Sequence, residues 1–251
     1  MKLTYPLLIS IVTISSALPA ATVADLTFTL NGENTEYSVS DCDQFANGYL
    51  DIPSIYNGLP VTSIGDGAFF GCSRLIIITI PNSVTSVGDN AFVGCSRITS
   101  MTIPDSLTTT GYGMFRFCTS LSSITIPDSL TSIADRTFDG CTALTNITIP
   151  NGVTSIGQYA FQSCSSLNNI IIPDSVITIG ASAFHDCSGL TSITIPDSVN
   201  SIALNAFADT GLSSLSFSNP LLEAAEAERD ARPTQSAYDS IVNERDAVHA
   251  K

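Results

Sequence analysis

Apolar residues recur along the middle of this chain at a fixed spacing of 23 residues. Seven consecutive segments begin at the same Val or Leu position, at Val61, Val84, Leu107, Leu130, Val153, Val176 and Val199. This period is typical of solenoids, in which each repeat is one supersecondary unit that buries its apolar face by stacking on its neighbours. The pattern therefore predicts one elongated array over residues 61–220, although 251 residues could also form one large or two small domains.

Each unit contains a short alternating run that predicts a β-strand. In the first unit this run is Leu75-Ile-Ile-Ile78-Thr-Ile80, and side chains two positions apart in a strand share a face. We therefore expect Ile78, Ile80 and their counterparts to line the interior. One phenylalanine per unit, in the segment that connects the strands, should form a second interior wall. A ligand-binding aromatic box is the alternative, but every unit needs this residue, which favours the core. The column is Phe69, Phe92, Phe115, Phe138, Phe161, Phe184 and Phe207.

Three short motifs in these units resemble a known family. The strand segment reads Leu-x-x-Ile-x-Ile, the connecting segment carries Ala-Phe-x-x-Cys, and an Ile-Pro-Asp/Asn step ends each strand. Together they resemble the BspA-like leucine-rich repeats of bacterial and protozoan surface proteins, and residues from about Asp25 also fit as a lead-in. The resemblance implies a leucine-rich-repeat solenoid with a parallel sheet on one face, and it implies an adhesion role.

The N-terminal part predicts an export signal followed by a cap. Residues 1–24 carry a single charge, Lys2, and then a short apolar run with small residues at its end, which is typical of a cleaved signal peptide. A retained membrane anchor is the alternative. In residues 25–60, two alternating segments flank Asn31-Gly32 and predict a β-hairpin that covers the open end of the array. A degenerate repeat around Leu50-Asp-Ile52 follows.

The C-terminal part, residues 221–251, predicts a helix. It is rich in Ala, Glu and Arg, and Tyr238, Ile241, Arg245 and Val248 recur at heptad-like spacing after Pro233. A short coiled coil that makes a homo-oligomer and a solvated, partly frayed helix are both consistent with so few heptads.

The composition narrows the range of partners. The chain has 23 acidic and 9 basic residues and a formal net charge of −14. Nucleic-acid binding is not expected, because it needs clustered Lys and Arg to neutralise phosphates. After signal cleavage, no segment is expected to insert into a membrane. The protein is thus expected to be secreted or at the cell surface.

Cysteine usage predicts a structural role. Cys72, Cys95, Cys118, Cys141, Cys164 and Cys187 recur at the repeat period, and Cys42 lies outside it. Export would permit disulfides, but parallel neighbours about 4.8 Å apart are too distant for a relaxed bridge. Buried free thiols are therefore favoured. With two histidines and no Cys-x-x-Cys pair, neither a zinc site nor another cofactor is expected.

The residues do not predict an enzyme. There is no Gly-x-Ser-x-Gly elbow and no Gly-rich phosphate loop, and His185 is the only histidine in the array. An Asx residue follows each Ile-Pro step, as in Asp105 and Asp128. A calcium ladder is conceivable, but Pro-Asp-Ser is better explained as a turn in which the Asx side chain bonds its own backbone.

The strand positions that flank the interior isoleucines remain as the candidate site. They are expected to point outward and to offer hydroxyl and amide groups to a protein or glycan partner. Threonine also favours strands, so a purely structural spacer, with residues 221–251 as its functional part, is an equal alternative. The candidate residues are Thr79, Ser100, Thr102, Ser123, Thr125, Asn146, Thr148, Asn169, Ser192 and Thr194.

Overall fold

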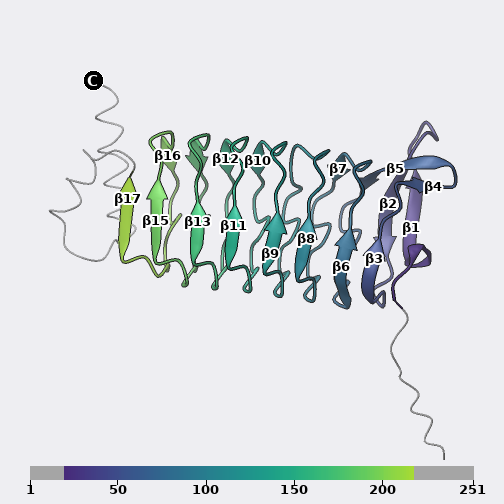
Figure 1. Cartoon of the computed structure of the whole chain (residues 1–251), viewed down its shortest axis with the longest axis horizontal. Coiled ribbons are helices and arrows are strands. Elements are labelled where there is room, and N and C mark those ends of the chain that lie inside the picture. The colour runs from purple at the N-terminus through teal and green to yellow at the C-terminus, as the bar shows by residue number, and fades with distance from the viewer. Residues whose placement is uncertain (1–19, 218–251) are drawn as a thin grey trace, which may run out of the picture.

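Each 23-residue unit makes one winding of the chain, and successive windings stack along the long axis of the molecule (Figure 1). The computed structural model describes residues 20–217. Two sides of each winding are β-strands, and the third is a series of turns. The repeat solenoid expected from the sequence is confirmed, with parallel strands one unit apart along its length.

The first strand ladder contains the Leu-x-x-Ile-x-Ile segments. Its strands pair in parallel two by two, and residues opposite each other in a pair are counterparts in neighbouring units, for example Ser100 beside Ser123 and Asn146 beside Asn169. The strands are β3 (Gly48–Asp51), β6 (Leu75–Thr79), β8 (Ser100–Thr102), β9 (Ser123–Thr125), β11 (Asn146–Thr148), β13 (Asn169–Ile171), β15 (Ser192–Ile195) and β17 (Ser214–Phe217).

A second ladder of shorter strands lies behind the first. It begins with β5 (Leu59–Ile64), and most later members are two residues long. Thr109 joins it through a single bridge to Ser132. These strands are β7 (Ser86–Val87), β10 (Ser132–Ile133), β12 (Ser155–Ile156), β14 (Thr178–Ile179) and β16 (Ser201–Ile202).

The connecting segments form the third side through hydrogen bonds between units. The amide of Phe69 donates to the carbonyl of Ala91 at 2.8 Å, and that of Phe92 donates to Met114 at 2.9 Å. Backbone groups within these turns are thereby paired although no regular strand forms. The one helical element in residues 20–217 is a 3-10 turn, Val23–Asp25.

The interior is built from the columns that the sequence predicts. All seven phenylalanines are buried, and consecutive rings stack with centroids 5.0–5.7 Å apart. Ile78, Ile147 and Ile170 are buried from the strand side, whereas Ile124 and Ile126 are only partly buried. The core assignment of the aromatic column is confirmed, and no room for a ligand lies between rings at this spacing.

The seven cysteines are free and buried, as expected. From Cys95 to Cys187, each thiol donates to the backbone carbonyl of a phenylalanine in the preceding unit, at 3.0–3.2 Å. Burial raises the pKa of the Cys187 thiol to about 12 and raises the pKa of Cys95, Cys118, Cys141 and Cys164 well above the ordinary value. These thiols are therefore neutral hydrogen-bond donors.

A β-hairpin covers the N-terminal end of the array, as expected. Strand β1 (Leu26–Leu30) pairs antiparallel with β2 (Tyr37–Cys42), and β2 continues in parallel onto β5. The turn differs from the expected tight Asn-Gly connection. It spans residues 31–36, with Asn31 N donating to Glu36 O at 3.0 Å and Asn34 in the left-handed region. Strand β4 (Ile55–Tyr56) forms a second, unforeseen hairpin with β5.

Two expectations concern residues outside the described range. The signal peptide falls largely on residues 1–19, and the C-terminal helix falls on 221–251. Within residues 20–217, no helix is long and apolar enough to cross a membrane.

Candidate binding surface

The outward side of the first ladder, here called the strand face, carries two rows of small polar side chains. Period-2 alternation produces the rows, because every second residue of a strand points away from the isoleucine columns. The ten predicted residues all lie in this ladder, so the structure brings them together on one surface. Ser100 is half-buried and the other nine are exposed: Thr79, Thr102, Ser123, Thr125, Asn146, Thr148, Asn169, Ser192 and Thr194.

The strand face is uncharged across these ten positions and regular in spacing. Counterparts in neighbouring strands lie about 4.8 Å apart, as strand pairing requires. Ile77 and Ile171 take apolar places in the two rows. The surface therefore presents repeated hydroxyl and amide groups, which can donate and accept hydrogen bonds, with few apolar interruptions.

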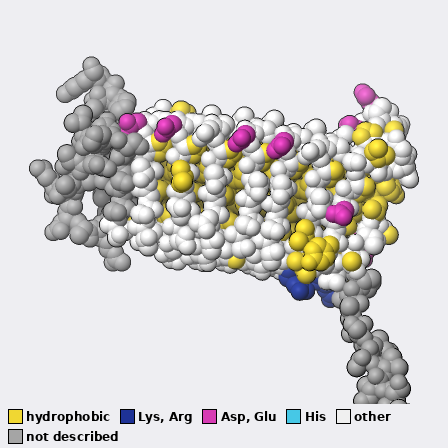
Figure 2. Space-filling view, viewed as in Figure 1, with side chains coloured by type: hydrophobic (Ala, Val, Ile, Leu, Met, Phe, Trp, Pro, Cys, Tyr) yellow, Lys and Arg dark blue, Asp and Glu magenta, His cyan; other side chains and the backbone are white. Residues whose placement is uncertain are grey.

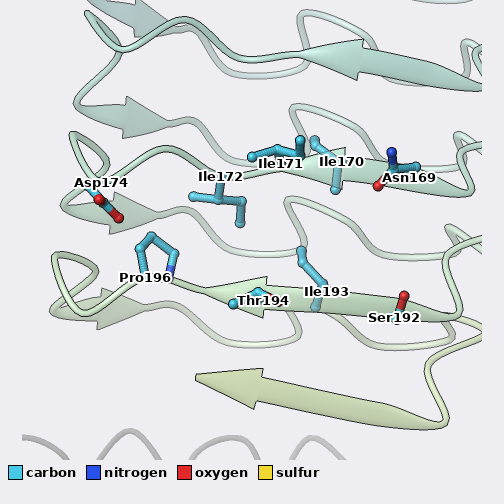
Figure 3. A pocket seen from close by; sticks show the side chains of 9 residues that line it. All are labelled: Asn169, Ile170, Ile171, Ile172, Asp174, Ser192, Ile193, Thr194 and Pro196. Atoms are coloured by element: carbon cyan, nitrogen blue, oxygen red, sulfur yellow. The ribbon is translucent and has the colours of Figure 1, made fainter. Parts of the chain in front are cut away.

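A shallow groove of about 280 Å³ lies on the strand face between β13 and β15 (Figure 3). Its walls include Asn169, Ser192 and Thr194 from the candidate set. Ile171 also lines it and is 67% exposed, and Asp174 lies in the turn that follows β13. Polar and apolar groups thus meet at one concave point, which is the kind of place where a ligand contacts a protein.

Acidic side chains line one long edge of the strand face, along the top in Figure 2. The turn residues Asp105, Asp128, Asp174 and Asp197 are all exposed. The expectation that they bond their own backbone was wrong. The turn closes instead through backbone bonds such as Leu107 N to Pro104 O at 3.0 Å, and in the described residues none of these four carboxylates makes a hydrogen bond.

An aromatic and arginine cluster lies at the N-terminal end of the strand face, and sequence reasoning missed it. Phe45 and Tyr49 are 70% and 63% exposed, and the Arg74 guanidinium carbon lies 5.1 Å from the centre of the Phe45 ring. Tyr49 lies in β3 beside Ile77 of β6, so it heads one of the two rows. The degenerate repeat around Leu50 could have indicated this cluster. Its outward strand position holds Tyr49, where most later units hold Ser or Asn.

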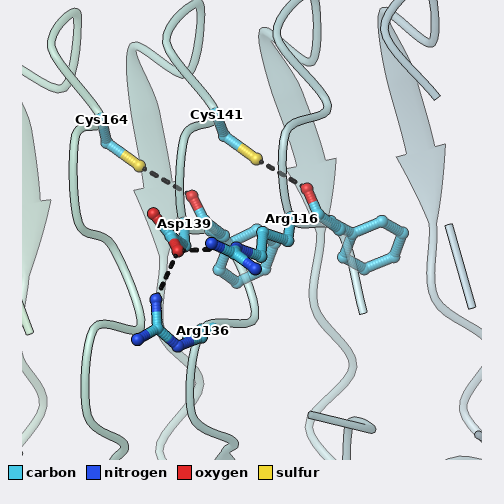
Figure 4. Close-up of polar contacts among 7 residues, drawn as sticks. Arg116, Arg136, Asp139, Cys141 and Cys164 are labelled. Atoms are coloured by element: carbon cyan, nitrogen blue, oxygen red, sulfur yellow. Dashed lines mark hydrogen bonds and ion pairs between the residues drawn. The ribbon is translucent and has the colours of Figure 1, made fainter. Parts of the chain in front are cut away.

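A second polar cluster belongs to the connecting segments. Asp139 is buried and accepts hydrogen bonds from Arg116 at 2.9 Å and from Arg136 at 3.0 Å (Figure 4). Arg116 also stacks on Phe117, and Arg136 stacks on Tyr159. Burial is the largest single influence on the pKa of Arg136 and would lower it. The hydrogen bond to Asp139 and the charges of Tyr112, Asp139 and Tyr159 together outweigh burial, so the pKa is raised. Asp139 thus links arginines of two consecutive units, and the cluster keeps one positive charge in excess.

Nothing in residues 20–217 gathers the groups that a metal or a nucleophilic reaction would need. No three His, Cys, Asp or Glu side chains in this range come together as metal ligands. His185 meets Asp209 at 3.2 Å, away from the strand face and among turn residues.

The repeat geometry and the sequence agree on the family. The chain matches the sequence model described as "BspA type Leucine rich repeat region", in six copies over residues 41–165 and 119–226. The chain belongs to the BspA-type leucine-rich repeat family. A comparison with curated proteins gave no match. This fold and family are typically non-catalytic.

Solved structures of bacterial leucine-rich repeat proteins are similar. The Treponema pallidum protein is 24% identical with a TM-score of 0.70, over 83% of this chain and 95% of that one. A leucine rich cell surface protein from Faecalibacterium prausnitzii is 34% identical with a TM-score of 0.69, over 81% of this chain. The aligned region spans 55% of that protein's length. A leucine-rich repeat protein from Eubacterium ventriosum is 24% identical with a TM-score of 0.65. That alignment covers 74% of this chain and 48% of the Eubacterium ventriosum chain.

Proposed function

We propose that this protein is a secreted or cell-surface binding module without catalytic activity, and that its strand face contacts a protein or glycan partner. The observation that carries the proposal is the strand face itself. Nine of its ten candidate side chains are exposed, all ten are uncharged, and all can form hydrogen bonds. The relative from Faecalibacterium prausnitzii is a cell surface protein, which supports a role outside the cell.

The strand face can be disabled without disturbing the interior. Ser123, Thr125, Asn146 and Thr148 are exposed and lie in the middle of the array, so changing all four to Lys leaves the core columns untouched. Four lysines would add bulk and charge where a partner must approach closely. On an array of immobilised glycans and extracellular matrix proteins, we expect the variant to lose capture of every probe that the parent binds.

A matched control carries four lysines on the second ladder. The lysines replace Thr154, Gln158, Ile177 and Thr178, which are exposed. The net charge therefore changes by the same amount as in the strand-face variant. This control should bind like the parent. Equal binding by both variants, or loss in the control alone, would contradict the strand-face proposal.

The structural-spacer alternative makes a different prediction for the tail. A protein that ends at residue 220 should keep array binding if the strand face is responsible. If the tail carries the function instead, through a homo-oligomer, the truncated protein should lose both self-association in sedimentation and capture on the array.

A further inference from the structure

Two arginines on the strand-face side of the molecule have no ion-pair partner among the described residues. Residues 20–217 contain four basic side chains, and Arg116 and Arg136 are both bound to Asp139. The other two, Arg74 and Arg97, occupy the same position of consecutive units, just before β6 and β8. Their backbone positions therefore lie one unit apart, at a step of about 4.8 Å.

One exposed ring, that of Phe45, lies directly beside Arg74. The Phe45 amide donates to Asp43 Oδ1 at 2.8 Å, and its neighbours Cys42 and Ala46 are buried, so the turn that carries the ring is fixed. The ring itself remains outside the core and meets the guanidinium of Arg74. Figure 2 shows this as a hydrophobic cluster with basic side chains next to it, at the lower edge of the strand face. Packing of the array does not explain why this side chain is aromatic.

The cluster is continuous with the polar rows. Tyr49 pairs with Ile77, and the same outer position continues through Ser100, Ser123 and Asn146 along the array. A ligand lying along this row would meet Tyr49 and Ile77 first and then hydroxyl and amide groups.

We propose that this cluster binds an acidic polysaccharide, a chain of sugars that carry carboxylates. Aromatic rings present flat apolar faces to the C–H side of a sugar ring, and the planar guanidinium groups match carboxylates in a bidentate manner. The hydroxyl and amide rows then hydrogen-bond the sugar hydroxyls beyond the cluster. This inference rests on the proposed binding role of the strand face and names its ligand class.

Titration calorimetry of the full chain with polygalacturonate tests the proposal, with dextran and polyglutamate as comparison probes. We expect binding of polygalacturonate only. Changing Arg74 and Arg97 together to Gln should weaken it at least about tenfold, a loss of about 1.4 kcal/mol. Tyr49→Ala should weaken it to a similar extent. Phe70→Ala, which removes a ring that is 58% exposed on the connecting segment, is the matched control and should bind like the parent.

Four results would overturn the inference: no binding of polygalacturonate, binding unchanged by the arginine changes, equal binding of dextran, or equal binding of polyglutamate. The fourth would identify a general anion site or an acidic peptide site instead. The proposed function can still stand in each case. If a matrix protein or neutral glycan on the array is captured by the parent and lost in the four-lysine variant, only the ligand class named here is wrong.

Discussion

At the scale of single residues, the phenylalanine stack shows how closely each side chain depends on its neighbours. Phe138 is fully buried, and its ring stacks on Phe115 at 5.7 Å and on Phe161 at 5.3 Å. Truncating it leaves a cavity between two units, which loosens both interfaces.

Phe138→Ala should lower the free energy of unfolding by about 3–5 kcal/mol. Urea titration followed by circular dichroism would measure the change. Phe70→Ala is the control, because that ring is 58% exposed and its loss should change stability little. An unchanged unfolding midpoint for Phe138→Ala would show that the column is not the core.

The buried thiols should make the protein sensitive to alkaline pH. The pKa of Cys187 is about 12 in the folded protein against an ordinary 9.0, because burial disfavours the thiolate. Between these values the unfolded chain has lost the proton and the folded chain keeps it. The free energy of unfolding therefore falls as pH rises, by up to about 1.4 kcal/mol per pH unit for each such thiol.

Urea unfolding from about pH 8 to about pH 11 should show full stability below pH 9 and a progressive loss above it. Cys187→Ala should have a shallower slope, since one titrating thiol is removed while the tyrosines stay the same. Identical slopes for the two proteins would mean that this thiol does not keep its proton in the folded state.

The sequence predicted which side chains are buried wherever the same residue type recurs at the repeat period. The aromatic, isoleucine and cysteine columns follow from the period, and their described members are buried except Ile124 and Ile126, which are partly buried. The bonds around Asp139 could not be foreseen, because Arg116 comes from the preceding unit and Arg136 from another column. Arg74 and Phe45 were missed for the same reason, since their contact joins the cap to the first unit.

At the scale of elements, the windings pack most tightly where small residues face each other. A Cβ placed on Gly180 would lie 2.6 Å from the backbone N of Gln158 in the preceding unit, closer than real Cβ contacts. Ala134 and Ala203 hold the same position in other units, so a methyl is accommodated there by a local shift. A branched side chain is the sharper test of this approach.

Gly180→Val should destabilise the array by about 1–3 kcal/mol, because two backbones must move apart. Differential scanning fluorimetry would record this as a lower melting temperature. Gly32→Val in the hairpin loop is the control, because no atom lies within 4 Å of its added Cβ. Equal melting temperatures for the two variants would contradict the close approach.

The two strand ladders differ in how far sequence could predict them. The first ladder contains the Leu-x-x-Ile-x-Ile segments, whose alternating apolar residues identify a strand. The second is built from pairs such as Ser132–Ile133, and two residues are too few to show a period. Strand β4 was also missed, because Ile55–Tyr56 forms only through pairing with β5.

At the scale of the whole molecule, the 23-residue repeat in the sequence is enough to predict the architecture. One local rule, applied at each unit, predicts a stacked array with a capped end, and the structure has both. The choice of partner was not predictable in the same way. In the binding mode proposed above, it depends on the first units, where tyrosine and arginine replace the residues that the repeat prefers.

The direction of the ladder hydrogen bonds has a mechanical consequence. Strands in Figure 1 lie across the long axis, so the bonds between units run along that axis. A pull on the two ends would therefore load these bonds one winding at a time, as in opening a zipper, rather than shear a whole sheet at once. Each released 23-residue winding would lengthen the chain by about 75 Å. In single-molecule force spectroscopy, the molecule should extend in a series of such steps at low force. Under tension it would therefore act as a compliant tether, which lengthens while part of the array remains folded.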